Sequence, residues 1–274
     1  MKKIVQLISI LLFASFTASA QQYAGYTLYS TMGGTSASLL DTNGNVYKTW
    51  SFTTTQKTAY SSYMLEGGVL LRTVSRSGNS FTGGPISGQV QKVAWNGSLL
   101  WDYVYSTYNY CTHHDICPMP NGNVLLIAYE RKTAAEVAAA GCTGFSGEMW
   151  PDKIVEVQPT GPTTGIVVWE WHAWDHLVQN VNSSLANYQT SIVNHPELLN
   201  INYTPKKDWM HMNGLDYNDS LDQIAFSCHN LNEVYIIDHS TTTAEAASHS
   251  GGNSGKGGDI LYRWGNPAAY GAAG

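Results

Sequence analysis

The sequence is poor in charged residues, since Asp, Glu, Lys and Arg make up only 12% of its 274 residues. Its formal net charge is −6, so it has no excess of basic residues to bind a phosphate backbone. Nucleic acid is therefore not expected as a partner. Long apolar runs are also lacking. The longest, residues 4–16, is too short to cross a bilayer, so no membrane span is expected.

Several sequence motifs that would indicate a particular function are missing. The sequence has no Walker loop, no dinucleotide-binding glycine fingerprint, no Gly-x-Ser-x-Gly elbow and no zinc-finger spacing. Their absence excludes the commonest nucleotide-dependent enzymes and the serine hydrolases that use that elbow. No cofactor is predicted.

The first twenty residues have the pattern of a secretory signal peptide. Lys2 and Lys3 precede the apolar run, and the small residues 18–20 form a cleavage site. We expect the mature chain to begin near Gln21, after cleavage at Ala20, and to be periplasmic or secreted. The short signal led by two lysines is typical of bacteria.

Cysteine is scarce, but its number is even. In an oxidising compartment the four cysteines allow three disulfide pairings, among which the sequence does not choose. Buried free thiols are an equal alternative. The four residues are Cys111, Cys117, Cys142 and Cys228.

Abundant Gly, Ser, Thr, Asn and Tyr favour an all-β fold, and a loose repeat supports it. In each copy, two apolar strands are joined by a turn and end on a tryptophan. The four copies run over residues 37–50, 90–101, 154–171 and 234–264. A period of fifty residues or more with short strands predicts a β-propeller with about four blades in residues 21–274. A pair of β-sandwiches is the alternative.

Three stretches depart from the repeat. Residues 133–141 are rich in alanine and predict a short helix, residues 175–205 are irregular, and residues 248–258 form a Gly/Ser/Asn loop. The last residues, up to Gly274, add no closing strand. A propeller normally closes with more blades, so we expect the chain to be an N-terminal fragment.

Two histidine-bearing segments occupy the same place in the repeat. His113 and His114 precede one buried strand, and His211 with Asn213 precedes another. Stacked repeats bring equivalent loops to one surface, so these residues are predicted to share a pocket. His229, at the end of the following strand, is predicted to lie near His211. An imidazole can act as a nucleophile, an acid–base or a donor, and an amide can donate to an anionic oxygen.

A structural role is the alternative for these histidines. In an extended segment His113 and His114 would point to opposite faces, whereas His211 and Asn213 would share one side. The sequence alone leaves open which of His113 and His114 faces the pocket.

A second dense segment covers residues 169–176. His172 and His176 are spaced i,i+4, which would suit a metal on a helix, but they follow a strand. Packing of the aromatic residues with a polar contact from Asp175 or His176 is favoured, and no metal is predicted. Trp171 could also line a pocket for a flat ring.

These segments resemble the bacterial arylsulfate sulfotransferases, which are exported six-bladed propellers. The most specific matches are Asp208-Trp209-x-His211-x-Asn213 and residues 257–267, Gly-Gly-Asp-Ile-Leu-Tyr-Arg-Trp-Gly-Asn-Pro. Weaker matches are His113-His114-Asp115 and residues 169–176. The resemblance implies transfer of a sulfuryl group from a phenolic sulfate donor to a phenol acceptor, through a sulfated histidine and without a nucleotide donor.

The resemblance also implies roles for individual residues. His211 and Asn213 match positions that contact the sulfuryl group, and one of His113 and His114, preferably His114, matches another pocket histidine. Asp175, His176 and Trp171 fall on matching stretches and are candidates for substrate binding.

The sequence departs from the family at two points. Where the family usually carries an arginine, this chain has His229, which lacks the fixed fork of guanidinium donors. The family's nucleophilic histidine belongs to a later blade, beyond Gly274. Two other functions are therefore kept as hypotheses. One is a non-catalytic ligand-binding propeller. The other is a metal-dependent hydrolase using His113, His114, His172 and His176.

Overall fold

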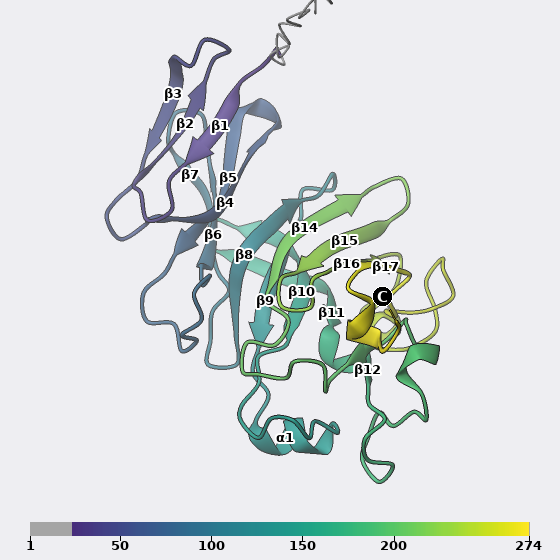
Figure 1. Cartoon of the computed structure of the whole chain (residues 1–274). Coiled ribbons are helices and arrows are strands. Elements are labelled where there is room, and N and C mark those ends of the chain that lie inside the picture. The colour runs from purple at the N-terminus through teal and green to yellow at the C-terminus, as the bar shows by residue number, and fades with distance from the viewer. Residues whose placement is uncertain (1–23, 274) are drawn as a thin grey trace, which may run out of the picture.

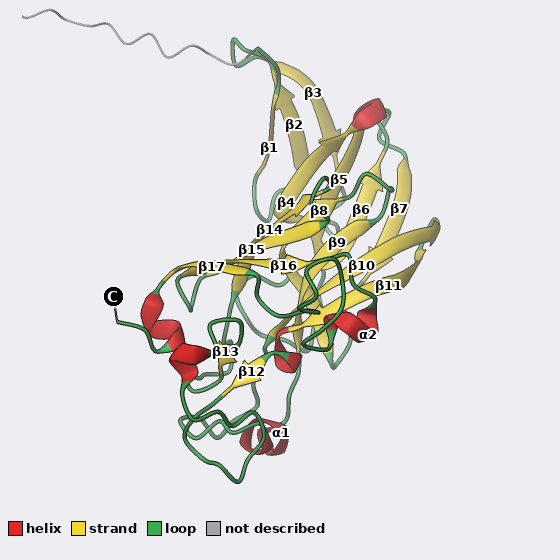
Figure 2. Cartoon of the chain, turned by 90° about the vertical axis from the view of Figure 1, so that its right-hand side faces the viewer, coloured by secondary structure: helices red, strands yellow, loops and turns green. Residues whose placement is uncertain are grey.

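The computed structural model describes residues 24–273, which form a series of antiparallel sheets (Figures 1 and 2). Three sheets have four strands each, one has three, and a two-stranded parallel ribbon lies among the loops. Strands predominate over two short α-helices, so the predicted all-β class is confirmed. The expected signal sequence, residues 1–20, lies outside the described residues.

Each of the four larger sheets is an up-and-down meander in which consecutive strands pair. The first sheet contains β1 (Thr27–Ser30), β2 (Ser36–Leu40) and β3 (Val46–Ser51). The second contains β4 (Thr58–Leu65), β5 (Val69–Ser75), β6 (Gly88–Val93) and β7 (Leu99–Val104). The third contains β8 (Tyr110–Pro118), β9 (Val124–Glu130), β10 (Asp152–Gly161) and β11 (Thr164–His172). The fourth contains β14 (Met212–Asn218), β15 (Gln223–Cys228), β16 (Glu233–Asp238) and β17 (Tyr262–Gly265).

The remaining elements are short. The parallel ribbon consists of β12 (Leu177–Val178) and β13 (Leu199–Asn200). The helices are α1 (Ala134–Ala139), α2 (Thr243–Ala246) and the 3-10 turns η1 (Glu66–Gly68), η2 (Ala173–Asp175), η3 (Ile192–Asn194) and η4 (Pro267–Tyr270). None of the helices in residues 24–273 has the length and apolar character that a bilayer span requires.

The repeat predicted from the sequence corresponds to real structural units. Each of the four predicted copies forms the last two strands of one sheet. Short turns close the first three pairs, whereas β16 and β17 are joined by a long segment that contains α2 and the loop 248–258. The predicted helix is α1, which begins at a capping box formed by Thr133 and Glu136. Residues 248–258 form the predicted loop, and residues 175–205 are largely irregular.

The sheets stack face to face in chain order. The position of β9 in this stack explains why its sequence is apolar without interruption. Its alternate residues Val124 and Leu126 pack toward the second sheet, whereas Leu125 and Ile127 pack toward the fourth. Side chains of a strand alternate between faces, so a sheet covered on both sides needs apolar residues at every position. Within residues 24–273 the stack does not close into a ring, and the propeller stays a prediction.

Tryptophans join neighbouring sheets in a repeated way. The indole N–H of Trp50 in β3 donates to the Ala94 carbonyl of the second sheet's last hairpin (2.9 Å). Trp101 in β7 donates likewise to Thr164 of the third sheet (3.0 Å). Trp169 in β11 donates to the Thr241 hydroxyl beyond β16 (3.1 Å). The tryptophans that mark the repeat thus fasten each sheet to the next.

All four cysteines are buried and free, so none of the three possible disulfide pairings is present. Burial raises the pKa of the Cys111 thiol to about 11 and that of Cys117 to about 12. Both are therefore neutral thiols at physiological pH, and they act as small apolar side chains of the core.

Candidate functional site

The first strand of each four-stranded sheet is broken by a bulge. In β4 the pairing slips between Thr58 and Ser62, and in β8 it slips between Thr112 and Ile116. In β14 it slips at Asn213. A bulge frees residues from the ladder and redirects their side chains. The residues freed in this way are 59–61, 113–115 and 213.

The three bulges meet at one cavity of about 450 Å³. This volume is within the range of roughly 300–1,000 Å³ that is usual for small-molecule sites. The cavity is lined by Tyr60, Ser61, Ser62, Tyr63, His114, Asp115 and Asn213. Three repeats therefore deliver side chains to one pocket, as the repeat position of the histidines predicts.

Asp115 holds the three first strands together at this cavity. Its Oδ1 accepts a hydrogen bond from the Tyr63 hydroxyl of β4 (2.7 Å). Its Oδ2 accepts one from the backbone N–H of Leu215 in β14 (3.2 Å). Burial raises the pKa of the Asp115 carboxyl. The residue fixes the relative positions of the bulges and has a structural role.

His114 and His211 both adopt a left-handed backbone conformation, with φ of 44° and 55°. This conformation is costly for residues other than glycine and is commonly found at functional sites. The left-handed conformation contradicts two expectations, both of which assumed that these segments are extended. His113 and His114 do not simply alternate across a strand, and His211 lies before β14 and not in line with Asn213.

The imidazoles of the site form a continuous group. The ring centroids of His114 and His211 are 4.7 Å apart, and those of His211 and His229 are 5.4 Å apart. Nδ1 of His113 lies 3.0 Å from Nδ1 of His114. His113, His114, His211 and His229 are thus brought together.

His113 lies beneath the cavity and does not line it. It is fully buried, stacks on Tyr129 and places Nε2 2.8 Å from Asp152 Oδ1. Burial lowers the pKa of His113 to about 3, so its ring is uncharged at neutral pH. Burial also raises the pKa of Asp152 well above its usual range. The Met212 N–H donates to the other oxygen of Asp152 (2.9 Å) and ties this pair to β14.

This chain of contacts controls the tautomer of His114. The Met212 hydrogen bond favours the ionised form of Asp152, in which His113 donates to it through Nε2 and accepts from His114 at Nδ1. Burial favours the protonated form, in which each of these donors and acceptors is reversed. With Asp152 ionised, His114 carries its lone pair on Nε2. Burial and the neighbouring histidines lower the pKa of His114 to about 3, so the ring is uncharged at neutral pH and its Nε2 can accept a hydrogen bond from a phenol.

His211 is oriented by a carboxylate of its own. Its Nδ1 lies 2.6 Å from Asp208 Oδ2, which leaves Nε2 for a ligand. Its backbone carbonyl accepts from the N–H of His229 (3.0 Å). His229 is exposed, with Nδ1 against Asn230 Oδ1 (3.1 Å). With Nδ1–H donated to Asp208, the uncharged His211 ring presents a lone pair at Nε2, and it donates there only when the ring is protonated. His229 adds a solvated imidazole beside it.

Asn213 lies between two hollows. Besides the first cavity it lines a second one, of about 250 Å³, on the side of the fourth sheet. His229, Val234 and Trp264 are among the other residues of this second hollow. A side-chain amide at this place can donate to a group in either hollow.

The segment 169–176 does not join the histidine group. Trp171 and His176 are fully buried, and Trp171 stacks on His176 and donates to the Gly258 carbonyl (2.7 Å). Asp175 is exposed at the end of η2. Substrate binding by Trp171 and His176 is not supported, because their polar atoms are already bonded in the core.

The ligand set of the metal-dependent hydrolase is likewise separated. His172 bonds Glu130 (3.1 Å) and Glu170 (3.2 Å), whereas His113 bonds Asp152. His176 bonds Asp259 (2.9 Å). A common ion for His113, His114, His172 and His176 is therefore contradicted by the partners that these side chains have.

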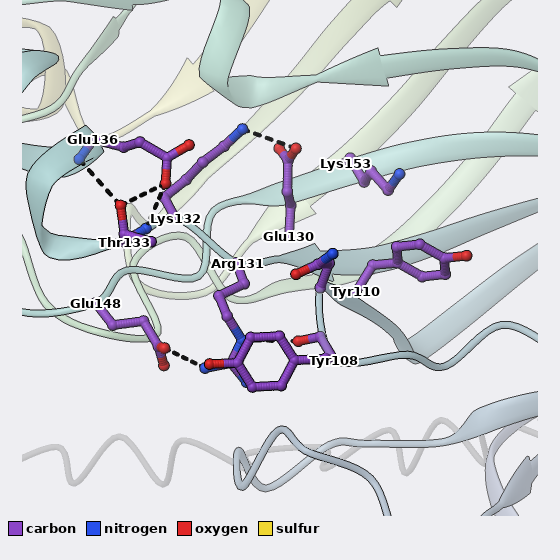
Figure 3. A pocket seen from close by; sticks show the side chains of 10 residues that line it. Tyr108, Tyr110, Glu130, Arg131, Lys132, Thr133, Glu136, Glu148 and Lys153 are labelled. Carbon is purple, nitrogen blue, oxygen red and sulfur yellow. Dashed lines mark hydrogen bonds and ion pairs between the residues drawn. The ribbon is translucent and has the colours of Figure 1, made fainter.

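A further hollow, of about 370 Å³, lies beside α1 and is lined by charged side chains (Figure 3). These charges are already paired: Arg131 with Glu148, and Lys132 with Glu130 (2.8 Å). Glu136 is engaged by the cap of α1. Because these charges neutralise one another, the hollow offers little electrostatic attraction to a charged ligand, and no function is assigned to it.

Two residues of the site, Tyr60 and Asp152, could not be recognised from the sequence patterns. Tyr60 forms the aromatic wall beside His114, with ring centroids 5.3 Å apart. The sequence offers little indication of Tyr60, because the β4 segment that carries it contains no histidine like those in or just before the other two bulged strands. Asp152 begins a buried strand, where an acidic residue close to the apolar pair Ile154-Val155 could have suggested a buried partner.

The fold and the site define an all-β protein of repeated antiparallel sheets with a histidine-rich cavity. The family model described as Arylsulfotransferase (ASST) matches residues 35–245. The match covers more than half of the sequence, so the chain belongs to the arylsulfotransferase family. No curated protein matches the sequence.

Two solved structures are similar over most of the chain. One is a protein of unknown function from Bacteroides caccae, with 10% identity and a TM-score of 0.45 over 87% of this chain. The other is the hydrazine synthase of Kuenenia stuttgartiensis, with 12% identity and a TM-score of 0.45 over 88%. The matches cover 57% and 59% of the lengths of those chains.

Proposed function

We propose that the chain is part of an exported aryl sulfotransferase that moves a sulfuryl group from a phenolic sulfate ester to a phenol. Membership of the arylsulfotransferase family supports this general activity. The observation that carries the proposal is the convergence of His114, Asn213 and Tyr60 on one cavity, with the His211 ring 4.7 Å from that of His114.

The proposed architecture is a β-propeller in which the stacked sheets are blades. Support comes from the repeated four-stranded meander and from the bulged first strands, which share one cavity. In this arrangement the first strand of each blade lines the centre. Export rests on the N-terminal signal pattern.

The proposed reaction has two displacements through a sulfo-histidine. First, an imidazole nitrogen attacks sulfur, the bond between sulfur and the phenolic oxygen breaks, and the leaving phenolate takes up a proton. Then the acceptor phenol loses its proton and attacks sulfur, and the N–S bond breaks. Both steps need donors for the sulfuryl oxygens and an acid–base for the phenol oxygen.

The residues of this chain fit the supporting roles. Asn213 donates to the sulfuryl oxygens through its side-chain amide, and His211 donates to them through Nε2 in its protonated form. His114 exchanges the proton of the phenol through Nε2, and His113 is a positioning residue that sets its tautomer. Tyr60 provides an aromatic face for the phenyl ring.

The first test is phenol-dependent release of 4-nitrophenol from 4-nitrophenyl sulfate, using protein expressed from the uninterrupted reading frame. We expect release to rise with added phenol, which distinguishes transfer from hydrolysis. No release by a folded protein would contradict the proposal. It would favour a ligand-binding propeller, for which the exposed His229 in place of an arginine is the supporting feature.

In that protein His211→Ala should lower the transfer rate at least about a hundredfold, because a catalytic donor is lost. Asn213→Ala should cost less, since one neutral donor is removed. His195→Ala is the matched control, because His195 bonds Glu197 (2.9 Å) and not the histidine group. Equal rates for His211→Ala and the control would remove His211 from the mechanism.

A further inference from the structure

A second group of possible metal ligands lies apart from the cavity, where the loop 248–258 returns to the core. His176, His249 and Asp259 each place one ligand atom within 4.8 Å of the others. Nδ1 of His176 and Nδ1 of His249 lie 2.9 Å and 2.7 Å from the same oxygen, Asp259 Oδ1. Two ring nitrogens thus converge on one carboxylate oxygen.

The contact on the far side of the His176 ring fixes its tautomer. Nε2 lies 2.8 Å from the backbone carbonyl of Ala246, which can only accept, so Nε2 carries the hydrogen. An uncharged His176 therefore turns the lone pair of Nδ1 toward Asp259, and two acceptors face each other at 2.9 Å. This contact is favourable only if a positive species lies there, either a proton or a metal ion.

A backbone carbonyl that orients the far nitrogen of a histidine is the usual support of a metal-bound imidazole. The fully buried His176 ring is also held flat against Trp171. Gly258 packs against the far side of the ring, because a Cβ there would lie 2.0 Å from the Ala246 carbonyl oxygen and 2.6 Å from His176 Nε2. The local chain is thus built to bring Asp259 beside His176.

We propose that His176, His249 and Asp259 bind a Zn²⁺ ion that fastens the loop 248–258 to the core. Two imidazole nitrogens and one carboxylate oxygen are a donor set that zinc accepts, with water in the fourth position. Ligand atoms of tetrahedral zinc lie roughly 3.3 Å apart, so the contacts to Asp259 would widen by a few tenths of an ångström. The His249 side chain is 62% exposed and can make that adjustment.

The test is a calorimetric titration of Zn²⁺ into the protein expressed from the uninterrupted reading frame, after dialysis against EDTA. We expect one ion per chain. His249→Ala should weaken binding at least about a hundredfold, because loss of an outer partner alone costs about 10–100-fold. His249 is exposed, so this variant should keep the circular dichroism spectrum of the unmodified protein.

His211→Ala is the control for zinc bound elsewhere, since it removes an imidazole from the other histidine group. Its zinc affinity should equal that of the unmodified protein. Three results would overturn the proposal: no stoichiometric zinc, unchanged affinity in His249→Ala, or loss of affinity in His211→Ala. The first would mean that a proton alone bridges His176 and Asp259. Sulfuryl transfer is not part of the readout, so the two proposals fail independently.

Discussion

At the scale of single residues, the site depends on backbone conformations that its residues do not favour. A left-handed non-glycine residue costs on the order of 1–3 kcal/mol, and both His114 and His211 adopt this conformation. The surrounding contacts hold them there: His114 N donates to Pro85 O (3.1 Å), and His229 N donates to His211 O. These contacts come from other segments, so the sequence around each histidine gives no sign of the strain.

His172 should make the stability of the protein depend on alkaline pH. Burial opposes its charge, but hydrogen bonds to Glu130 and Glu170 outweigh burial and raise the pKa of His172 to about 9, from a usual 6.5. Its charged form therefore contributes to folding below about pH 6.5, and this contribution is lost as the pH rises through about 9. Each pKa unit corresponds to about 1.4 kcal/mol, so the loss is about 3 kcal/mol at most.

Urea unfolding at pH values from 6 to 10 measures this effect. The free energy of unfolding of the unmodified protein should fall with pH across this window, and His172→Gln should flatten that slope. His195→Gln, which changes a histidine with a single carboxylate partner, should keep it. An unchanged slope in His172→Gln would contradict the assignment.

The candidate residues were predictable only in part. The repetition of histidine segments before β9 and β15 correctly indicated that His113, His114, His211 and His229 come together. It could not indicate Asp152, because the contact with His113 spans 39 residues. That contact exists only because β9 pairs with β8 on one side and with β10 on the other.

At the scale of elements, the bulges of β4, β8 and β14 place the site, and the tryptophans hold the sheets that carry them. Trp101→Phe should lower the free energy of unfolding by about 1–3 kcal/mol. The change removes a buried N–H donor and leaves the Thr164 carbonyl without its partner. Loss of ring volume in a core side chain acts in the same direction.

Trp264→Phe is the matched control, because this tryptophan of β17 is 68% exposed. It should change the free energy of unfolding by no more than about 0.5 kcal/mol. The comparison requires denaturant titrations of both variants at one pH. Equal destabilisation by the two substitutions would show that the Trp101 hydrogen bond does not hold the sheets together.

At the scale of the whole molecule, stability should be uneven along the stack. The first sheet shares a small core, which consists of Ala37, Leu39, Trp50, Leu70 and Val93, whereas β9 is buried on both faces. Regions with few buried apolar contacts open at lower free energy. Amide hydrogens of β1–β3 should therefore exchange faster than those of β9 and β10.

Hydrogen–deuterium exchange followed by mass spectrometry resolves this difference. Peptides from residues 27–51 should take up deuterium first, while peptides from residues 124–130 should remain protected longest. Similar protection of both regions would mean that the stack opens as one cooperative unit.

The sequence by itself determined the all-β class, the four strand–turn–strand units and the short helix α1, because apolar alternation, turn residues and caps act over a few neighbouring residues. It also indicated the histidines, through their place in the repeat. Only the tertiary structure decided that His114 lines the cavity while His113 lies beneath it. It also decided that His176 pairs with Asp259 and not with His172, the histidine four residues before it. Those outcomes depend on bulges, and on contacts between residues 39 to 83 positions apart, which local patterns do not encode.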